Sequence, residues 1–471
     1  MKISEIKGRI KLPAMASIYY LTASVAGKAV SFVITPFITR LLDKESYGQF
    51  SLYMTVVGGA SLITATVTSS SAFYKGMKDH ETNKTDYLRS VLTVSVCFSM
   101  LICLLLFTFS RLLHIDKQLL LPMAAQIFCD GIIAIAMSID RYHYKYKSVF
   151  WIAVISAIFP PVCSVLILRR WGGGYAVRIY ALLFISLCIA AFSIRKILCL
   201  SKGGNGRSVK YVIKRSLPML PGGVSAALLT QADKLFITAI MGTAALAKYT
   251  VVYSLGIALQ FTVTAIASAL TPWIMRRLVA GEVDRISQLI APMTVGYYAL
   301  SLCLVAIAPE AMRILAPSDY ADALPAILPL ALSTPFLFIS TVATAGITHS
   351  GKGRYLLISS AAGAFFGVTF NYMLIDRFGF SGAGIGVFLC QGVRTAIELT
   401  LLKRVNLENV IPLRQMLVPC LIGIGGGAIM YILRQSVIPR IVALSLPALM
   451  LIYCLRRAED LILEKGTKKV S

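Results

Sequence analysis

The first long apolar stretch of the chain decides what class of protein this is. Residues 14–41 read AMASIYYLTASVAGKAVSFVITPFITRL, with Lys28 as the one charged residue near the middle. A helix needs about 20 apolar residues to cross the hydrocarbon core of a bilayer. A cleavable signal peptide has an apolar core of only about 7–15 residues. The stretch therefore predicts a retained first transmembrane helix, which follows the basic segment 1–13.

Similar apolar stretches follow along the rest of the chain. Of the 471 residues, 57% are hydrophobic and only 14% are charged, whereas a soluble domain carries about 25% charged residues. We therefore expect an all-α polytopic membrane protein with about 14 transmembrane helices. The predicted spans are 14–41, 50–73, 90–110, 118–139, 149–168, 178–199, 216–242, 246–272, 288–308, 323–349, 355–375, 380–402, 415–433 and 436–455.

The basic residues lie in short runs between these spans, and the net charge is +25. If the N-terminus is cytoplasmic, about 31 of the 46 Lys and Arg residues fall on the cytoplasmic side and about 12 on the other. Because cytoplasmic loops are enriched in Lys and Arg, both termini are expected in the cytoplasm. A nucleic-acid-binding protein would instead gather its basic residues on one face of a soluble fold.

The chain shows no pattern typical of a metal site or a catalytic domain. The ten cysteines lie almost entirely in apolar stretches without a CxxC pair, and the four histidines are scattered. Free cysteine packs as a small hydrophobe, and metal sites need closely spaced ligands. The loops between spans are short, so we expect no metal, no cofactor and no enzymatic domain.

The middle of the chain indicates two halves. The basic stretch 200–215 contains Gly203-Gly204-Asn205-Gly206 and is expected to be a flexible cytoplasmic linker. Phe37-Ile38-Thr39 near the end of the first span recurs as Phe236-Ile237-Thr238 near the end of the seventh. An offset of six spans keeps both copies in the same orientation, which predicts a parallel repeat. We expect an N-terminal lobe (1–199, helices 1–6), the linker (200–215), a C-terminal lobe (216–402, helices 7–12), and helices 13 and 14 with a cytoplasmic tail (403–471).

Four stretches carry a resemblance to a known family. They are FITRLL at 37–42 with Tyr47-Gly48, Leu217-Pro218 with QADKLFI at 231–237, AKY at 247–249, and Gly351-Lys352 with NYMLI at 371–375 and FGFSGA at 378–383. In these stretches the chain resembles the polysaccharide exporters of the multidrug/oligosaccharidyl-lipid/polysaccharide superfamily, most closely the Wzx-type O-antigen flippases. One departure is Asp376-Arg377, where the family usually has a proline.

The resemblance implies a fold of two six-helix lobes related by a pseudo-twofold axis, with two further C-terminal helices. It implies a transporter, not an enzyme, in the bacterial inner membrane. The substrate would be an undecaprenyl-pyrophosphate-linked oligosaccharide, an O-antigen or related repeat unit, moved from the inner to the outer leaflet by alternating access. Proton or sodium coupling is expected. Further partners would be membrane lipid and, in the same pathway, a polysaccharide polymerase and a chain-length regulator.

Cationic residues near or inside the spans are the candidate substrate-binding residues, because a charge within the membrane is costly and usually functional. They are Lys28, Lys234, Arg394 and Arg40. Lys28 and Lys234 are predicted to supply positive potential for the pyrophosphate. Alternatively, Lys28 forms a structural salt bridge with an acid on another helix, for which Asp233 is a candidate.

Three acidic residues are candidates for ion coupling or gating: Asp233, Glu398 and Asp130. Glu398 follows Arg394 by four residues, so these two side chains could instead neutralise each other on one helix face. Asp130 has Gln126 one turn before it. Asp130 is either a coupling-ion carboxylate or a buried acid that carries a proton.

Other functions remain to be compared. A drug or cation antiporter of the multidrug and toxic-compound extrusion type would favour acids over lysines at its site and usually has twelve spans. A lipid II flippase of the same superfamily is a nearer alternative. A membrane-embedded polysaccharide polymerase or O-antigen ligase would usually carry a large outward loop with catalytic residues, and here those loops are short.

Overall fold

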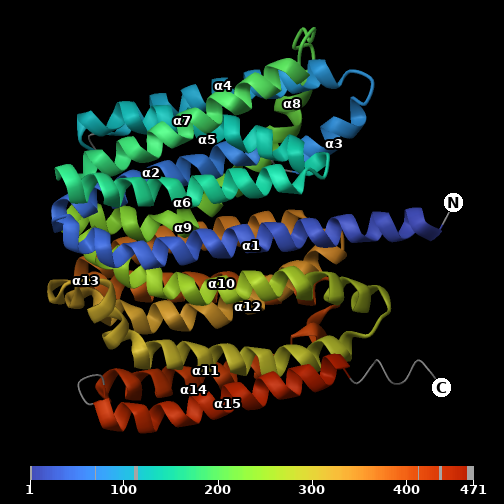
Figure 1. Ribbon diagram of the computed structural model, residues 1–471. Helices are drawn as coiled ribbons and strands as arrows, with labels where there is room; N and C mark the ends of the chain where they lie inside the picture. The colour runs from blue at the N-terminus through green and yellow to red at the C-terminus, as the bar shows by residue number, and fades with distance from the viewer. Residues whose placement is uncertain (1–2, 69–70, 111–114, 412, 434–436, 464–471) are drawn as a thin grey trace. The chain divides into compact units, whose positions relative to one another are not determined.

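The chain folds almost entirely into long helices (Figure 1). The computed structural model describes residues 3–68, 71–110, 115–411, 413–433 and 437–463, and all regular structure within these residues is helical. This confirms the prediction of an all-α fold. The α-helices are α1 (Ile3–Leu41), α2 (Lys44–Thr68), α3 (Ser71–Asp79), α4 (Lys84–Phe109), α5 (Lys117–Tyr142), α6 (Tyr146–Trp171), α7 (Tyr175–Leu200), α8 (Val209–Ser216), α9 (Leu220–Met241), α10 (Thr243–Val279), α11 (Val283–Leu315), α12 (Ile327–His349), α13 (Arg354–Lys403), α14 (Leu413–Ile432) and α15 (Val437–Leu463). Short 3₁₀ helices occur at η1 (Leu217–Met219), η2 (Ser318–Ala326) and η3 (Glu408–Val410).

The predicted spans fall on long helices in chain order. By length and hydropathy, nine helical segments of the described chain are suited to cross a membrane. Large apolar side chains point away from the protein on many of these helices, for example Leu121, which is 80% exposed, and Phe192, which is 69% exposed. Exposed apolar surface of this extent is stable only against lipid. The protein is therefore a multi-pass membrane protein.

Helix α13 covers two of the predicted spans. Its 50 residues are divided by a break at Gly379, whose backbone has φ 54° and ψ −128°. Only glycine adopts this conformation readily, because it lacks a Cβ atom. The glycine-rich FGFSGA stretch therefore turns the chain between the predicted spans 355–375 and 380–402.

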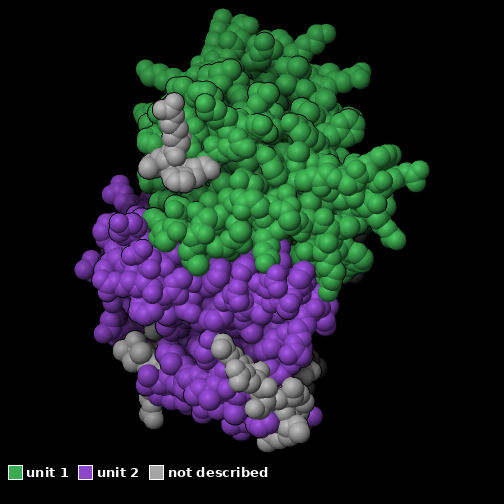
Figure 2. Space-filling model, turned by 90° about the vertical axis from the view of Figure 1, so that its left-hand side faces the viewer, with its two compact units in different colours: residues 1–247 green, residues 248–471 purple. Residues whose placement is uncertain are grey.

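The chain divides into two compact units (Figure 2), Met1–Ala247 and Lys248–Ser471. In unit 1, α2 packs against α5, α7 and α9, and α1 lies along α6. Gly223 allows α9 to approach α2 closely, because a Cβ atom there would lie 2.4 Å from the Thr66 hydroxyl oxygen. Through this contact α9 belongs to the first compact unit. The lobes expected from the repeat, which separate at residues 200–215, stay a prediction.

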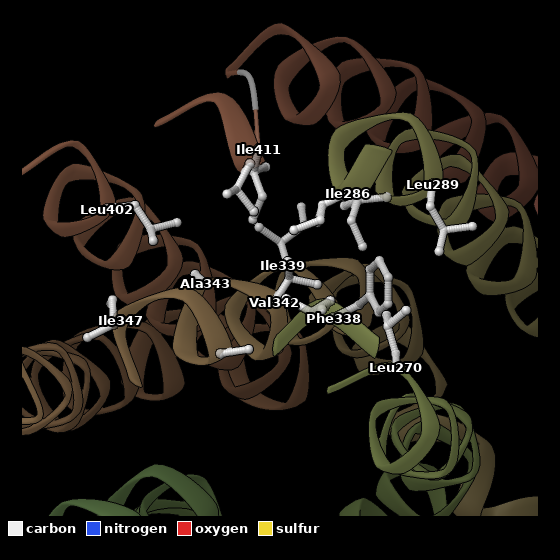
Figure 3. Packing of buried hydrophobic residues seen from close by; sticks show 14 of the residues in the cluster. Leu270, Ile286, Leu289, Phe338, Ile339, Val342, Ala343, Ile347, Leu402 and Ile411 are labelled. Carbon is white, nitrogen blue, oxygen red and sulfur yellow. The ribbon is translucent and has the colours of Figure 1, made fainter. Parts of the chain in front are cut away.

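Unit 2 is built around α12. Phe338, Ile339, Val342 and Ala343 of this helix are all at most 1% exposed, and they pack against α10, α11 and α13 (Figure 3). A helix that is buried on all sides is apolar all round, and α12 accordingly has no charged residue before His349. Within a membrane this core is held by close van der Waals packing, since lipid removes most of the hydrophobic driving force.

The basic stretch 200–215 contacts α4 and leads into a short helix. The carboxylate of Asp86, at the start of α4, accepts a hydrogen bond from the backbone N–H of Asn205 at 2.6 Å. It also accepts one from the hydroxyl of Ser208 at 3.4 Å. Residues 209–216 then form helix α8. These two bonds connect the stretch to α4, and its role as a linker between two lobes stays a prediction.

Candidate functional site

A groove of about 410 Å³ lies in unit 1 between α1, α5 and α6. Among the described residues that line it, Lys28 and Arg141 are cationic and none is acidic. Most of the rest are small or apolar. A concave site lined by charges of one sign focuses its potential on a ligand of the opposite sign. The groove therefore suits an anionic group attached to an apolar carrier. The lining residues are Ala23, Gly27, Lys28, Ser31, Met137, Arg141, Val149, Ala153 and Ala157.

The small residues around Lys28 bring α1 and α6 together. A Cβ atom on Gly27 would lie 2.9 Å from the Cβ atom of Ala157 on α6. Small residues allow such close helix contacts in membranes. Lys28 therefore lies on a helix that is packed tightly on one side, with its own side chain exposed to the groove.

Arg141 lines the groove, and the adjacent Asp140 points in a different direction and forms an ion pair with another helix. Asp140 is fully buried; it forms an ion pair with Lys196 of α7 and accepts a 2.7 Å hydrogen bond from the hydroxyl of Ser148. Consecutive residues on a helix point about 100° apart. The side chain of Arg141 therefore points away from this acid and lines the groove instead.

Lys234 of α9 adds a second candidate cation to unit 1. Its ammonium group donates hydrogen bonds to the Gln231 side-chain oxygen at 3.2 Å and to the Thr230 carbonyl oxygen at 3.3 Å. The charge of the adjacent Asp233 acts on Lys234 more strongly than the charge of Lys28 does. Two like charges inside a membrane repel each other, and the carboxylate of Asp233 offsets part of this repulsion. Asp233, the adjacent residue, is 3% exposed.

Asp130 occupies a polar cluster between α2, α5 and α7. One carboxylate oxygen accepts a 2.7 Å hydrogen bond from the hydroxyl of Ser61, and the other accepts a 2.8 Å bond from the amide of Gln126. The same amide nitrogen lies 2.9 Å from the hydroxyl oxygen of Ser186. The contact with Gln126 was expected from its spacing of one turn, and it is present.

The candidate residues of unit 2 form a pair. The guanidinium of Arg394 donates to the carboxylate of Glu398 at 3.1 Å, one helical turn away. The hydroxyl of Ser359 donates to the same carboxylate oxygen, also at 3.1 Å. The structure thus confirms that Arg394 and Glu398 can neutralise each other, the alternative to their roles in substrate binding and gating. Glu398 is completely buried.

Arg40 lies in the last turn of α1 and is not among the described residues that line the groove. Its guanidinium is exposed and donates a 3.0 Å hydrogen bond to the carbonyl oxygen of Pro36. Such a contact satisfies the last carbonyl groups of a helix. The structure therefore gives Arg40 a capping contact. Its role in substrate binding stays a prediction.

The sequence reasoning missed Arg141 as a site residue. Arg141 follows the predicted span 118–139 and was therefore assigned to the basic cytoplasmic loop. Its only sequence signal is its place two residues beyond an apolar span. Ser61 and Ser186 were missed for another reason: serine is common in any transmembrane helix and bonds to its own backbone there. Only the packing of the helices shows which side chains meet.

In unit 1, the end of α3 is connected to α8 by a hydrogen bond to a carboxylate outside the predicted spans. Asp79, the last residue of α3, accepts a 2.6 Å hydrogen bond from the Tyr211 hydroxyl. This bond holds the pKa of the Asp79 carboxyl below its usual value, with smaller contributions from nearby basic residues. Asp79 lies outside the predicted spans, so its charge is solvated.

The sequence of the chain matches one family profile. The match covers residues 15–277, and the family is described as polysaccharide biosynthesis protein. It includes α1 with Lys28, the α5–α6 part of the groove, and α9 with Lys234. A search of curated proteins finds no significant match.

The fold is similar to that of solved transporters. The lipid II flippase MurJ in an inward closed conformation superimposes with a TM-score of 0.70 and 14% identity, over 95% of this chain and 100% of that one. An inward-facing MATE family multidrug resistance transporter of the MOP superfamily gives 0.60 and 16%, over 85% and 98%. The Vibrio cholerae MATE transporter VcmN, in a mutant form, gives 0.58 and 18%, over 84% and 98%. The chain therefore has the fold of this group of membrane transporters.

Proposed function

Because the chain belongs to the polysaccharide biosynthesis protein family, we propose that it is a flippase for an undecaprenyl-pyrophosphate-linked oligosaccharide. The substrate is an O-antigen or related polysaccharide repeat unit, moved from the inner to the outer leaflet of the bacterial inner membrane. The observation that carries this proposal is the groove of unit 1, whose described lining includes Lys28 and Arg141 and no acidic side chain.

The chemistry of the substrate explains why such a groove is needed. A pyrophosphate carries at least two negative charges, and transfer of such a group into hydrocarbon without compensation is prohibitively costly. Lys28 in the groove and Lys234 on α9 would replace water as the partners of these charges. The polyprenyl tail stays in the bilayer. The protein supplies a passage with matched charge and breaks no bond.

Orientation in the membrane follows from the distribution of basic residues. With both termini in the cytoplasm, the exposed end of α5 that carries Arg141 faces the leaflet where lipid-linked precursors are made. In this orientation the substrate meets Arg141 before Lys28. Alternating access, coupled to a proton or sodium gradient, then opens the site to the outer leaflet. A polymerase and a chain-length regulator would receive the exported units.

A cation antiporter is the main competing function, since MATE family transporters share this fold. An organic cation would be bound by carboxylates in a cavity free of lysine and arginine. The groove has the opposite composition, with two cations and no acid. A lipid II flippase is closer in chemistry, because lipid II also carries a pyrophosphate, and it differs in the sugar part of the substrate.

The test is to delete the gene in its host and measure surface polysaccharide together with lipid-linked intermediates. Loss of surface glycan, with complete lipid-linked units trapped on the cytoplasmic side, is expected. Accumulation of lipid II instead would identify the other flippase substrate. Unchanged glycan and intermediates, in a strain with no other flippase, would contradict the proposal and favour the antiporter.

Complementation then connects the activity to the groove. Lys28→Ala should fail to restore export at normal protein level, and Lys28→Arg should restore part of it because it keeps the charge. Lys147→Ala is the matched control, since Lys147 is an exposed lysine at the start of α6 outside the groove lining. Full export by Lys28→Ala would contradict the proposed role of Lys28 in binding the substrate.

A further inference from the structure

The polar cluster around Asp130 holds a carboxylate without a cationic partner in the described part of the chain. Its oxygens accept hydrogen bonds from Ser61 at 2.7 Å and from Gln126 at 2.8 Å. Both donors are neutral. Asp140, ten residues later on the same helix, forms an ion pair with Lys196. A partly buried carboxylate whose hydrogen-bond donors are neutral is costly within a membrane, so a positive charge would be bound favourably at Asp130.

The amide of Gln126 provides a second, independent observation. Gln126 is only 4% exposed, and its amide nitrogen donates to both Asp130 and Ser186. Its amide oxygen is buried and accepts no hydrogen bond from any described residue. Most buried polar atoms have a partner. The cluster therefore has an uncommitted oxygen on a side chain that already points at the carboxylate.

We propose that this cluster is a binding site for a monovalent cation, either a proton or Na⁺. The ligands are the two carboxylate oxygens of Asp130, the hydroxyl oxygens of Ser61 and Ser186, and the amide oxygen of Gln126. Hard cations take oxygen ligands of these types. A half-turn of the amide exchanges its nitrogen and oxygen, so the group that now donates to the carboxylate can instead accept or coordinate. The site is separate from Lys28 and Lys234.

The position of the site on α2 gives cation binding a route to the substrate residues. Ser61 lies three residues, about one turn, after Gly58 on this helix. The amide of Gln231 of α9 lies against Gly58, 3.2 Å from where its Cβ atom would be. Gln231 in turn accepts the hydrogen bond from Lys234 at 3.2 Å. Cation binding at Asp130 thus acts on α2, and α2 contacts the side chain that positions Lys234. This part of the inference rests on the proposed flippase function.

Few other ionisable groups of the described residues lie around Asp130. A change in carboxyl protonation at this cluster can therefore be attributed to Asp130. On α2 the titratable group is Tyr53, and on α5 it is Cys129 beside Asp130. From α7, Ser186 faces the cluster through Gln126. On α4, Ser99 lies 3.4 Å from the Cβ position of Gly131. Further along α5 and α7, Asp140 and Lys196 form an ion pair and neutralise each other.

Binding of ²²Na⁺ to the purified full-length protein tests the site without any substrate, so failure of the flippase proposal leaves the test intact. For sodium we expect saturable binding of about one ion per chain, weakened as the pH falls because protons compete. Asp130→Asn should abolish binding. Ser61→Ala and Gln126→Ala should each weaken it about tenfold. Asp116→Asn is the matched control, an exposed acid at the start of the same helix.

For a proton instead of sodium, the protein should not bind ²²Na⁺. Acidification should then produce an infrared band of a protonated carboxyl group that persists in Asp116→Asn and is missing in Asp130→Asn. If Asp130→Asn does not fold, Ser61→Ala and Gln126→Ala still report on the site. They keep the carboxylate and should shift the Na⁺ affinity or the pH midpoint of the band. Sodium binding or a carboxyl band that is unchanged in all three variants, or the absence of both signals, would overturn the proposal.

Discussion

Lys28 of α1 and Arg394 of α13 are both cations within long apolar helices, and both are candidates for contacting the substrate. Their surroundings differ. Arg394 has Glu398 one turn away and forms an ion pair with it. Lys28 lines a groove whose other charged residue is Arg141, also a cation. Glu398 neutralises the charge of Arg394 locally, one turn away on the same helix, whereas the described lining of the groove places Arg141, a second cation, with Lys28. We expect the first arrangement to affect stability, and we propose that the second one binds the substrate.

The largest effect expected from this comparison concerns export. Lys28→Ala should abolish glycan export without lowering the amount of protein, because the substrate loses a cationic partner in the membrane. Arg394→Ala should leave measurable export wherever folded protein is present. The measurement is surface glycan normalised to membrane-inserted protein in complemented deletion strains. Equal loss of export per folded molecule in both variants would contradict the proposed difference between Lys28 as a binding residue and Arg394 as a structural one.

The second effect concerns stability and has the opposite order. Arg394→Ala leaves the buried carboxylate of Glu398 with only the neutral hydroxyls of Ser340 and Ser359 as donors among the described residues, and removing one partner of a buried pair costs about 3 kcal/mol. Thermal unfolding of the purified protein in detergent measures this loss. The double variant Arg394→Ala with Glu398→Gln should recover most of it, since the uncompensated charge is gone. Lys28→Ala should unfold close to wild type.

The sequence could predict the features that depend on helical spacing. The apolar spans follow from composition alone, because about 20 apolar residues fix the length of a membrane helix. The contacts of Arg394 with Glu398 and of Gln126 with Asp130 are both i,i+4 pairs. Residues four apart meet on any helix, whatever its neighbours. These contacts were therefore predictable before the helices were packed.

The contacts that build the candidate sites depend on packing between helices, and the sequence does not show them. Ser61 and Asp130 are 69 residues apart, and Asp140 and Lys196 are 56 apart. No periodicity connects such positions. For the same reason, Arg141 was indistinguishable from the basic residues that set membrane orientation. Ile38 and Ile237 of the FIT repeat are both completely buried, and the equivalence of the two lobes stays a prediction.

Arg141 tests whether the groove acts as a whole. Arg141→Ala should lower export roughly tenfold, less than Lys28→Ala, because Arg141 is at the exposed end of α5 where water screens its charge. Arg141→Lys should keep most activity. Initial export rates at several levels of lipid-linked substrate should show the loss mainly as weaker apparent affinity. A normal rate in Arg141→Ala would restrict the anion site to Lys28 and Lys234.

The smallest effect is expected at Asp79. Its mutation shows how much an exposed acid of unit 1 contributes to stability. Its hydrogen bond from Tyr211 lowers the pKa of the carboxyl in the folded protein. A lowered folded-state pKa means that the contribution to stability is present above the unfolded value of about 3.9 and is lost as the pH falls. Asp79→Asn should therefore reduce the melting temperature slightly at pH 7, and the difference from wild type should persist down to about pH 4 and shrink as the pH falls below it. A difference that grows on acidification would show that the carboxylate opposes folding, and that the exposed acids of unit 1 follow different rules from its buried ones.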